Sequence, residues 1–508
     1  MSVVYWILLT ALLGYIFLKR KTKKNIEKIA SEGLKSLPEP PGKKPFIGHA
    51  HLLVRPGLGK LCTKWKKTLG DILALQAVTL NIVVLNSAKG VGDLFQKRGA
   101  SYSSRNGTFI LWEIVGRKIC FILSPYNDWY KKMTPIVHGI FNKSKIETFI
   151  DLITECCNDL VTNLKNAQNS DGIFPRPYLE HTTLNIILNI IYGTKSSGIQ
   201  DPLYLKLVSL THVWFSFGNI KARIYDWFPP LRNFLTGKMS IMPSALENRD
   251  EWEKVLGELL EKVKRDEKKT PCIARDLLAK VEEGVITELE ISHLSISLII
   301  AGMETTASSL TWILAAIANN PEIQLRAQKE LDSVVGQSKL PSHKDLPSLP
   351  YIRAIVKEGL RWAPPIPMGV GHLTEQDDEY MGYHILKNSV VLLNMLAIHS
   401  DPTRYPNPHI FNPDRYLGVT ESAATLARGN PEKRDQFAFG AGRRLCVGIH
   451  LAELELENLL ASILAAFKIE IPHSKNESSS KLIDVSKYSF QGGAQWISPY
   501  KICFIPRS

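Results

Sequence analysis

The sequence contains few cysteines, and their spacing is irregular. Seven occur in 508 residues, at Cys62, Cys120, Cys156, Cys157, Cys272, Cys446 and Cys503. Domains that depend on disulfides usually pair an even number of cysteines at regular spacings. The odd count and irregular spacing argue against a disulfide framework and predict a protein of a reducing compartment.

Glycine-rich nucleotide loops and basic–aromatic nucleic-acid motifs are missing. Gly440-x-Gly442 lacks a third glycine and a preceding β-strand run, so it does not match a dinucleotide-binding loop. We find neither a flavin nor a nicotinamide motif elsewhere. Any redox reaction of this chain therefore needs electrons from another protein, and no nucleic-acid partner is expected.

An apolar run at the N-terminus falls short of the ~20 residues that comfortably span a bilayer. It extends from Val3 to Leu18 and is followed directly by basic residues, with nine Lys or Arg against three Glu between Lys19 and Lys44. Positive charge after an apolar run holds that side in the cytoplasm, whereas a cleaved signal peptide carries its charge in front. We expect residues 1–20 to form an uncleaved membrane anchor and residues 21–45 a basic, proline-rich linker.

A long helical pattern in the second half of the chain carries an unusual polar segment. Thr287-x-x-Glu290 is typical of a capping box, and helical character continues to Asn320, before Pro321. Midway lies Ala301-Gly302-Met303-Glu304-Thr305-Thr306, in which glycine and β-branched threonines weaken a helix. A threonine hydroxyl bonded to the preceding turn bends a helix, and a buried glutamate needs water or a proton relay.

One cysteine lies in a glycine-rich loop directly before a helical pattern. The loop reads Phe439-Gly-Ala-Gly-Arg-Arg-Leu-Cys446-Val-Gly448, and apolar residues recur at helical spacing from Ile449. A helix N-terminus and backbone N–H groups lower the pKa of a thiol, and glycines let the backbone approach a flat ligand. We therefore expect Cys446 to be a thiolate ligand, with the fixed charge of Arg444 beside it.

The pattern Phe-x-x-Gly-x-Arg-x-Cys-x-Gly resembles the haem-binding loop of the cytochrome P-450 family. The segment from Ala301 to Thr306 is similar to that family's oxygen-activation segment, and Glu358-x-x-Arg361 with the later Phe411-Asn-Pro-Asp-Arg415 is similar to its structural triad. The matching motifs extend over essentially the whole chain. The resemblance implies the P-450 fold, mainly α with a small β-rich lobe, in a catalytic domain at 46–508 behind an N-terminal transmembrane helix.

The resemblance also assigns roles to individual residues. Cys446 would bind the iron of haem b, Glu304 and Thr305 would deliver protons during oxygen activation, and Glu358, Arg361 and Arg415 would lock the thiolate loop. The further residues expected to contact haem are Arg444, His372, Phe439, Gly440, Gly442, Gly448, Ala301, Trp129 and Lys132. The expected substrate contacts are Phe109, Ile300, Ile366 and Met368.

One haem contact departs from the family pattern. Many members carry Trp followed four residues later by Arg, and this pair binds the haem propionates. Here Met133 follows Trp129 at that spacing, so either Lys131 or Lys132 is the candidate substitute. Lysine binds as a point charge where arginine would bind with two donors.

The resemblance implies a haem-thiolate monooxygenase that inserts one atom of O2 into an apolar organic molecule. Electrons would come from NADPH through a cytochrome P-450 reductase, with cytochrome b5 as a second donor, and the chain would be a single-pass protein of the endoplasmic reticulum with a cytosolic catalytic domain. The reductase would meet a basic face containing Lys131, Lys132, Lys433, Arg434 and Arg443. Two alternatives stay open: an oxygen-independent isomerase or dehydratase on the same fold, and a non-catalytic haem sensor.

Overall fold

The computed structural model describes residues 33–507 apart from 54–56, 168, 229–231, 233–239, 338, 473–481 and 492–493. The expected membrane anchor and the first part of the expected linker lie outside these residues. The described part of the linker, 33–45, forms no helix. This agrees with its prolines, which fix the backbone dihedral φ and remove hydrogen-bond donors.

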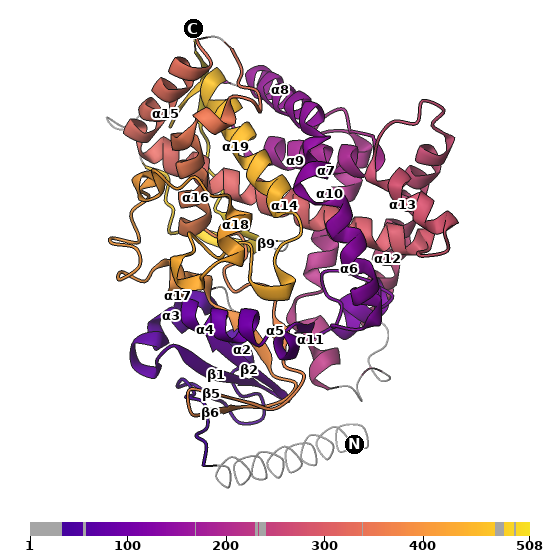
Figure 1. The fold of residues 1–508 in the computed structure, drawn as a ribbon, viewed down its shortest axis with the longest axis vertical. Helices are drawn as coiled ribbons and strands as arrows, with labels where there is room; N and C mark the ends of the chain where they lie inside the picture. The colour runs from indigo at the N-terminus through magenta and orange to yellow at the C-terminus, as the bar shows by residue number, and fades with distance from the viewer. Residues whose placement is uncertain are drawn as a thin grey trace.

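The chain is mainly helical, as the sequence predicts (Figure 1). The α-helices are α2 (Ala50–Leu53), α3 (Leu58–Leu69), α4 (Ala88–Val91), α5 (Gly99–Tyr102), α6 (Asp128–Ile140), α7 (Lys143–Glu147), α8 (Ile150–Ala167), α9 (Arg176–Tyr192), α10 (Pro202–Ser216), α11 (Ile220–Trp227), α12 (Met242–Arg265), α13 (Ile273–Glu282), α14 (Glu288–Asn319), α15 (Pro321–Val334), α16 (Pro350–Trp362), α17 (Met395–His399), α18 (Ala423–Arg428) and α19 (Ile449–Ala466). Short π-helical turns η1 (Gly92–Lys97) and η2 (Phe109–Val115) interrupt the N-terminal part.

The strands gather mostly in a small lobe at the lower end of Figure 1. They are β1 (Ile72–Ala77), β2 (Leu80–Leu85), β3 (Ser104–Arg105), β4 (His372–Leu373), β5 (Asp378–Tyr380), β6 (Tyr383–Ile385), β7 (Val390–Leu393), β8 (Phe467–Glu470), β9 (Tyr488–Gln491), β10 (Ala494–Ile497) and β11 (Cys503–Pro506). The largest sheet has the order β1-β2-β7-β4-β3, in which β2 and β7 pair in parallel and the other neighbours are antiparallel. This sheet brings segments far apart in sequence together, because β3 lies beside β4.

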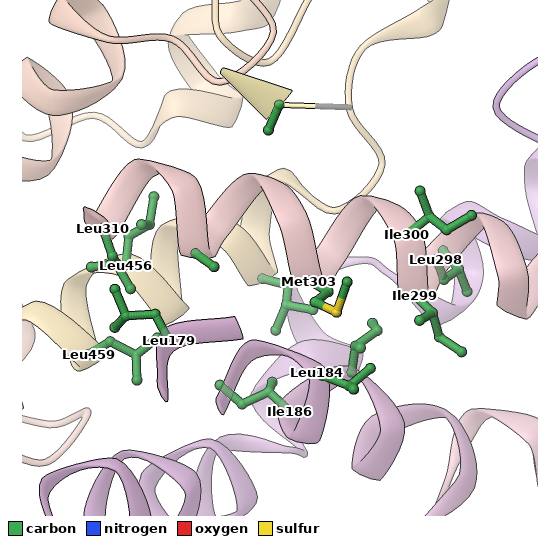
Figure 2. Packing of buried hydrophobic residues seen from close by; sticks show 14 of the residues in the cluster. Leu179, Leu184, Ile186, Leu298, Ile299, Ile300, Met303, Leu310, Leu456 and Leu459 are labelled. Atoms are coloured by element: carbon green, nitrogen blue, oxygen red, sulfur yellow. The ribbon is translucent and has the colours of Figure 1, made fainter. Parts of the chain in front are cut away.

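Helix α14 is the central element of the core. It begins with the capping box that the sequence predicts, since Thr287 Oγ1 accepts from Glu290 N and Glu290 Oε2 accepts from Thr287 N. Helix α9 packs along it, and α19 and α16 contact it from other sides. Leu184 and Ile186 of α9, and Leu456 and Leu459 of α19, lie around α14 in Figure 2.

Among the described residues, α14 alone is long and apolar enough to cross a membrane. Its most apolar window is 83% buried inside the protein, however. A helix that is apolar on all sides is expected in the centre of a large domain as well as in a bilayer. We therefore assign α14 to the core.

A buried ion-pair network joins α16 to the segment before the cysteine loop. Arg361 donates from Nε to Glu358 Oε2 and from Nη2 to Glu358 Oε1, both at 2.6 Å, and Arg415 Nε lies 3.4 Å from Glu358 Oε1. The same carboxylate accepts from Asn412 N at 2.8 Å. The structure thus brings Glu358, Arg361 and Arg415 together, as the sequence motif suggests.

We predict that Arg361→Ala lowers the free energy of unfolding by about 3–5 kcal/mol, because it leaves a buried carboxylate without its bidentate partner. The side chains of Arg361 and Glu358 are 1% and 0% exposed, respectively. Arg326→Ala is the control, since Arg326 pairs with Asp414 at 2.6 Å on the surface, and such pairs contribute at most about 1 kcal/mol. Urea unfolding followed by tryptophan fluorescence measures the free energy of unfolding of both variants. Equal losses in the two variants would contradict a structural role for the buried Glu358–Arg361 pair.

Candidate functional site

One face of α14 is accessible although the helix lies in the core. Ala301 is exposed and Thr305 is half-buried, whereas Ile299, Met303 and Glu304 are fully buried. Residues four apart share one face of a helix. The accessible face at Ala301 and Thr305 therefore borders a hollow inside the protein. Thr305 Oγ1 donates to Ala301 O at 2.7 Å, the bond to the preceding turn that the sequence predicts.

The cysteine loop is shaped by two glycines in left-handed backbone conformations. Gly440 has φ 72° and Gly442 has φ 68°. At Gly442 a Cβ atom would lie 2.0 Å from the carbonyl oxygen of Phe95, so only glycine fits there. Cys446 N donates to Phe439 O at 2.9 Å, and Gly448 is the N-cap residue of α19. The loop therefore holds Cys446 just before the start of α19.

Two opposing effects act on the pKa of the Cys446 thiol. Burial raises the pKa of its thiol to about 11, while the nearby Gly448 N–H lowers it by a smaller amount. Cys446 nevertheless has accessible surface, so this surface faces an interior hollow, where desolvation outweighs the helix terminus. A metal ion bound to the sulfur would favour the thiolate.

His399 connects the ion-pair network to the cysteine loop, and the sequence motifs gave it no role. Its Nε2 accepts from Phe437 N at 2.8 Å, so Nδ1 carries the proton and donates to Arg361 O at 2.9 Å. Phe437 O in turn accepts from Gly440 N at 2.9 Å. Burial and the charge of Arg361 hold the pKa of His399 well below its usual range, which keeps the ring neutral.

A group of basic side chains converges where β3 meets β4. Arg105 pairs with His372 across the two strands, and the positive charges of Arg105 and Arg444 add to burial in lowering the pKa of His372. Arg444 donates to Ser103 O at 2.7 Å and to Ser124 O at 2.6 Å. His372 Nδ1 lies 2.6 Å from Tyr102 O.

Arg105 is the residue of this group that sequence reasoning missed. Its guanidinium donates from Nη1 to Val370 O, but among the described residues its buried Nε has no hydrogen-bond partner. Burial and the neighbouring Arg444 lower its pKa to about 9. The sequence held one signal, since no acidic residue occurs between Asp93 and Glu113 to pair with it locally.

Trp129 and Lys132, expected at the propionates, have another partner. Trp129 Nε1 donates to Glu290 Oε1 at 2.6 Å, and Lys132 Nζ donates to the same oxygen at 2.7 Å. Glu290 belongs to the first turn of α14. The two residues therefore tie α6 to α14.

Glu304 is buried next to a second acidic residue. Desolvation and then the charge of Glu180 raise the pKa of Glu304 to about 8. Trp496 Nε1 donates to Glu304 Oε2 at 3.1 Å. Glu304 Oε1 has no hydrogen-bond partner among the described residues, and His212 Nε2 lies 3.7 Å from it. At neutral pH this carboxyl group therefore holds a proton.

The four expected substrate contacts differ in accessibility. Phe109 and Ile366 are half-buried, with the Phe109 ring 5.9 Å from that of Tyr225. Met368 is half-buried and packs against the core of the small lobe. Ile300 is only 2% exposed within the main core, so it has almost no surface to offer a substrate, contrary to the expectation (Figure 2).

The residues present fit haem. Cys446 is an accessible cysteine, and a cysteine sulfur is a suitable ligand for a haem iron. The basic group of Arg105, Arg444 and His372 contains a buried donor without a partner, which suits a carboxylate such as a propionate. Ala301 has a small, exposed side chain, so the accessible face of α14 leaves room for a flat ligand beside it.

Comparisons with known proteins agree with this fit. The family model described as cytochrome P-450 matches residues 38–491. Cytochrome P-450 monooxygenase virE of Hypocrea virens is 31% identical, covering 93% of this chain and 86% of its own length, and cytochrome P-450 monooxygenase ple1 of Rhodocybe pseudopiperita is 33% identical, covering 85% and 83%. A zebra fish cytochrome P-450 structure with progesterone superimposes with a TM-score of 0.73 at 23% identity, covering 88% of this chain and 99% of that one, which shows the fold.

We predict that Glu304 titrates around pH 8, because its pKa is raised from the ordinary value of 4.5. Infrared difference spectra should show a carboxylic-acid band that is lost around pH 8 and is missing in Glu304→Gln. Since the folded state binds this proton more tightly than the unfolded state, wild-type stability relative to Glu304→Gln should fall as the pH rises from about 4.5 to about 8 and level off above that.

Glu455→Gln is the matched control for the infrared experiment. Burial also raises the pKa of Glu455 to about 8, so this variant should lose a different band and retain that of Glu304. A Glu304 band that titrates close to pH 4.5 would show that the carboxyl group is solvated.

We predict that Arg105→Leu speeds haem loss to apomyoglobin by about tenfold, because a charge-assisted hydrogen bond to a carboxylate is worth roughly that much. Arg98→Leu is the control, since Arg98 lies nearby in sequence but pairs with Asp378 at 2.9 Å. Unchanged haem loss from Arg105→Leu would contradict a propionate contact.

Proposed function

Since the chain belongs to the cytochrome P-450 family and is a monooxygenase of that family, we propose that it inserts one atom of O2 into an apolar organic substrate. The observation that carries this proposal is Cys446, whose accessible sulfur lies in an interior hollow behind a glycine-shaped loop. When bound there, haem supplies the redox chemistry that cleaves O2 and oxidises the substrate.

The chain's own residues bind and orient the cofactor. Cys446 would hold the iron, with Phe439, Gly440, Gly442 and Gly448 keeping the loop in place. We assign the propionates to Arg105 and Arg444. His372, in its neutral form, would line the haem site without binding a propionate. Its Nδ1 faces the Tyr102 carbonyl, and the Phe95 ring stacks on its ring with the centroids 3.9 Å apart.

Glu304 and Thr305 would move protons toward the hollow. Glu304 holds a proton at neutral pH and faces away from bulk water, and Thr305 lies on the accessible face of α14. A carboxyl group whose pKa is close to the working pH can both give and regain a proton, as general acid–base catalysis requires. Ala301, on the same face, leaves space for a small ligand.

The apolar class of substrate is supported by the residues that would surround it. Phe109 and Ile366 are half-buried hydrophobic side chains, and Met368 is half-buried against the core of the small lobe. No carboxylate is among these expected contacts. Apolar walls with few polar groups favour burial of an apolar ligand.

We propose that electrons come from NADPH through a flavoprotein reductase, with cytochrome b5 as an additional donor. The exposed residues Lys131, Lys433 and Arg443 support a basic docking face. Arg434, expected in the same face, is only 2% exposed and donates to Gly440 O at 2.7 Å, so it belongs to the loop's support instead.

We further propose that the protein is anchored in the endoplasmic reticulum membrane by residues 1–20 with its catalytic domain in the cytosol. The apolar run followed by basic residues supports this orientation. Flotation of the intact chain with microsomes, compared with a chain that begins at Gly33, tests the anchor. Equal release of both chains into the soluble fraction would refute it.

We predict that the reduced protein with CO gives the Soret band of a thiolate-ligated haem and that Cys446→Ala loses this band. Cys503→Ala is the control, because Cys503 is a half-buried cysteine in β11 away from the loop motif. A histidine-type CO spectrum from folded wild-type protein would refute the ligand.

Substrate turnover of the same sample separates the two alternatives. A monooxygenase consumes O2 only when NADPH and the reductase are both present. Turnover without either would indicate the oxygen-independent isomerase or dehydratase, and ligand binding without turnover of any substrate in a broad panel would indicate the sensor.

A further inference from the structure

Three potential metal ligands from three helices meet beside the catalytic hollow. Glu180 of α9, His212 of α10 and Glu304 of α14 each offer a ligand atom, and these atoms all lie within 4.8 Å of one another. From this cluster we propose a binding site for a divalent transition-metal ion of the Zn²⁺ type. The proposal goes beyond haem binding, because none of these residues is among those assigned to hold haem.

The ligand types suit such an ion. One imidazole nitrogen and two carboxylate oxygens are a common ligand set for zinc, with water in the remaining position. Ligand atoms around tetrahedral zinc lie about 3.4 Å apart, and His212 Nε2 is already 3.7 Å from Glu304 Oε1. A small side-chain rotation of His212, which is 45% exposed, would close the set.

The unsatisfied oxygen of Glu304 points into this cluster. Oε1 is buried and lacks a hydrogen-bond partner among the described residues, while Oε2 accepts from Trp496 Nε1 at 3.1 Å. A buried acceptor without a partner is costly, and a cation would satisfy it. His212 gives the ion a route from solvent to this atom.

The charge balance of the cluster also favours a cation. Arg176 donates from Nε to Glu180 Oε1 at 2.9 Å, and its guanidinium lies 3.8 Å from the centre of the Trp496 ring. One guanidinium therefore faces two carboxyl groups, and burial with the Arg176 charge keeps His212 neutral. A further positive charge beside the second carboxyl group would let it ionise at a lower pH.

A bound ion would slow turnover, a consequence that rests on the proposed function. It would coordinate the carboxylate of Glu304, the residue assigned to proton movement. The site itself does not depend on that assignment, so its test measures binding and not activity.

The experiment titrates Zn²⁺ into chelator-stripped ferric holoenzyme in competition with a chromophoric chelator. We expect one equivalent to bind to the wild type. His212→Ala should bind it at least about 100-fold more weakly, since even outer partners of metal ligands contribute 10–100-fold. Loss of a half-exposed side chain should leave the fold intact, which the unchanged haem spectrum verifies.

Two further variants complete the test. Glu304→Gln should weaken binding to a similar extent, because an amide oxygen is a poorer zinc ligand than a carboxylate. His409→Ala, an exposed histidine outside the cluster, should bind Zn²⁺ as the wild type does. Equal affinity in His212→Ala and wild type, or no equivalent bound by the wild type, would overturn the site.

Discussion

The position of the reactive sulfur depends on the buried ion pair between Glu358 and Arg361. The Glu358 carboxylate receives two hydrogen bonds from Arg361, and Arg361 in turn accepts from His399, which holds Phe437 and so the loop before Cys446. Each link is buried and directional, so water does not compete for it. A network of this kind fixes a loop that glycines alone would leave free to adopt several conformations.

The groups around the interior hollow include charged and ionisable side chains whose charges are not matched by their neighbours among the described residues. On one side, Arg105 has a buried Nε without a partner among the described residues, and burial raises the pKa of the Cys446 thiol. A propionate would satisfy the guanidinium and an iron ion would favour the thiolate, which is the physical basis for the assigned cofactor. On the other side, the carboxyl groups of Glu180 and Glu304 lie near the Arg176 guanidinium.

Local sequence patterns predict the long helices correctly. The capping box at Thr287 and the helix after Gly448 lie where the sequence predicts them, because both depend on residues adjacent in the chain. Strands β1 and β2 also depend on local sequence, since they form a hairpin. The contacts of Trp129 and Ile300 were predicted less well, because they depend on packing between distant segments.

The sequence by itself determined which atoms can do chemistry here: the cysteine in its glycine loop, the Glu304–Thr305 pair and the acid and bases of the ion-pair network. Tertiary structure alone decided their state. It buried Cys446, which raises the pKa of its thiol, and it paired Lys132 with Glu290 while leaving Arg105 Nε without a partner among the described residues. The reason is that desolvation and the choice of partner depend on which side chains surround a group, and residues more than a hundred positions away supply most of those neighbours.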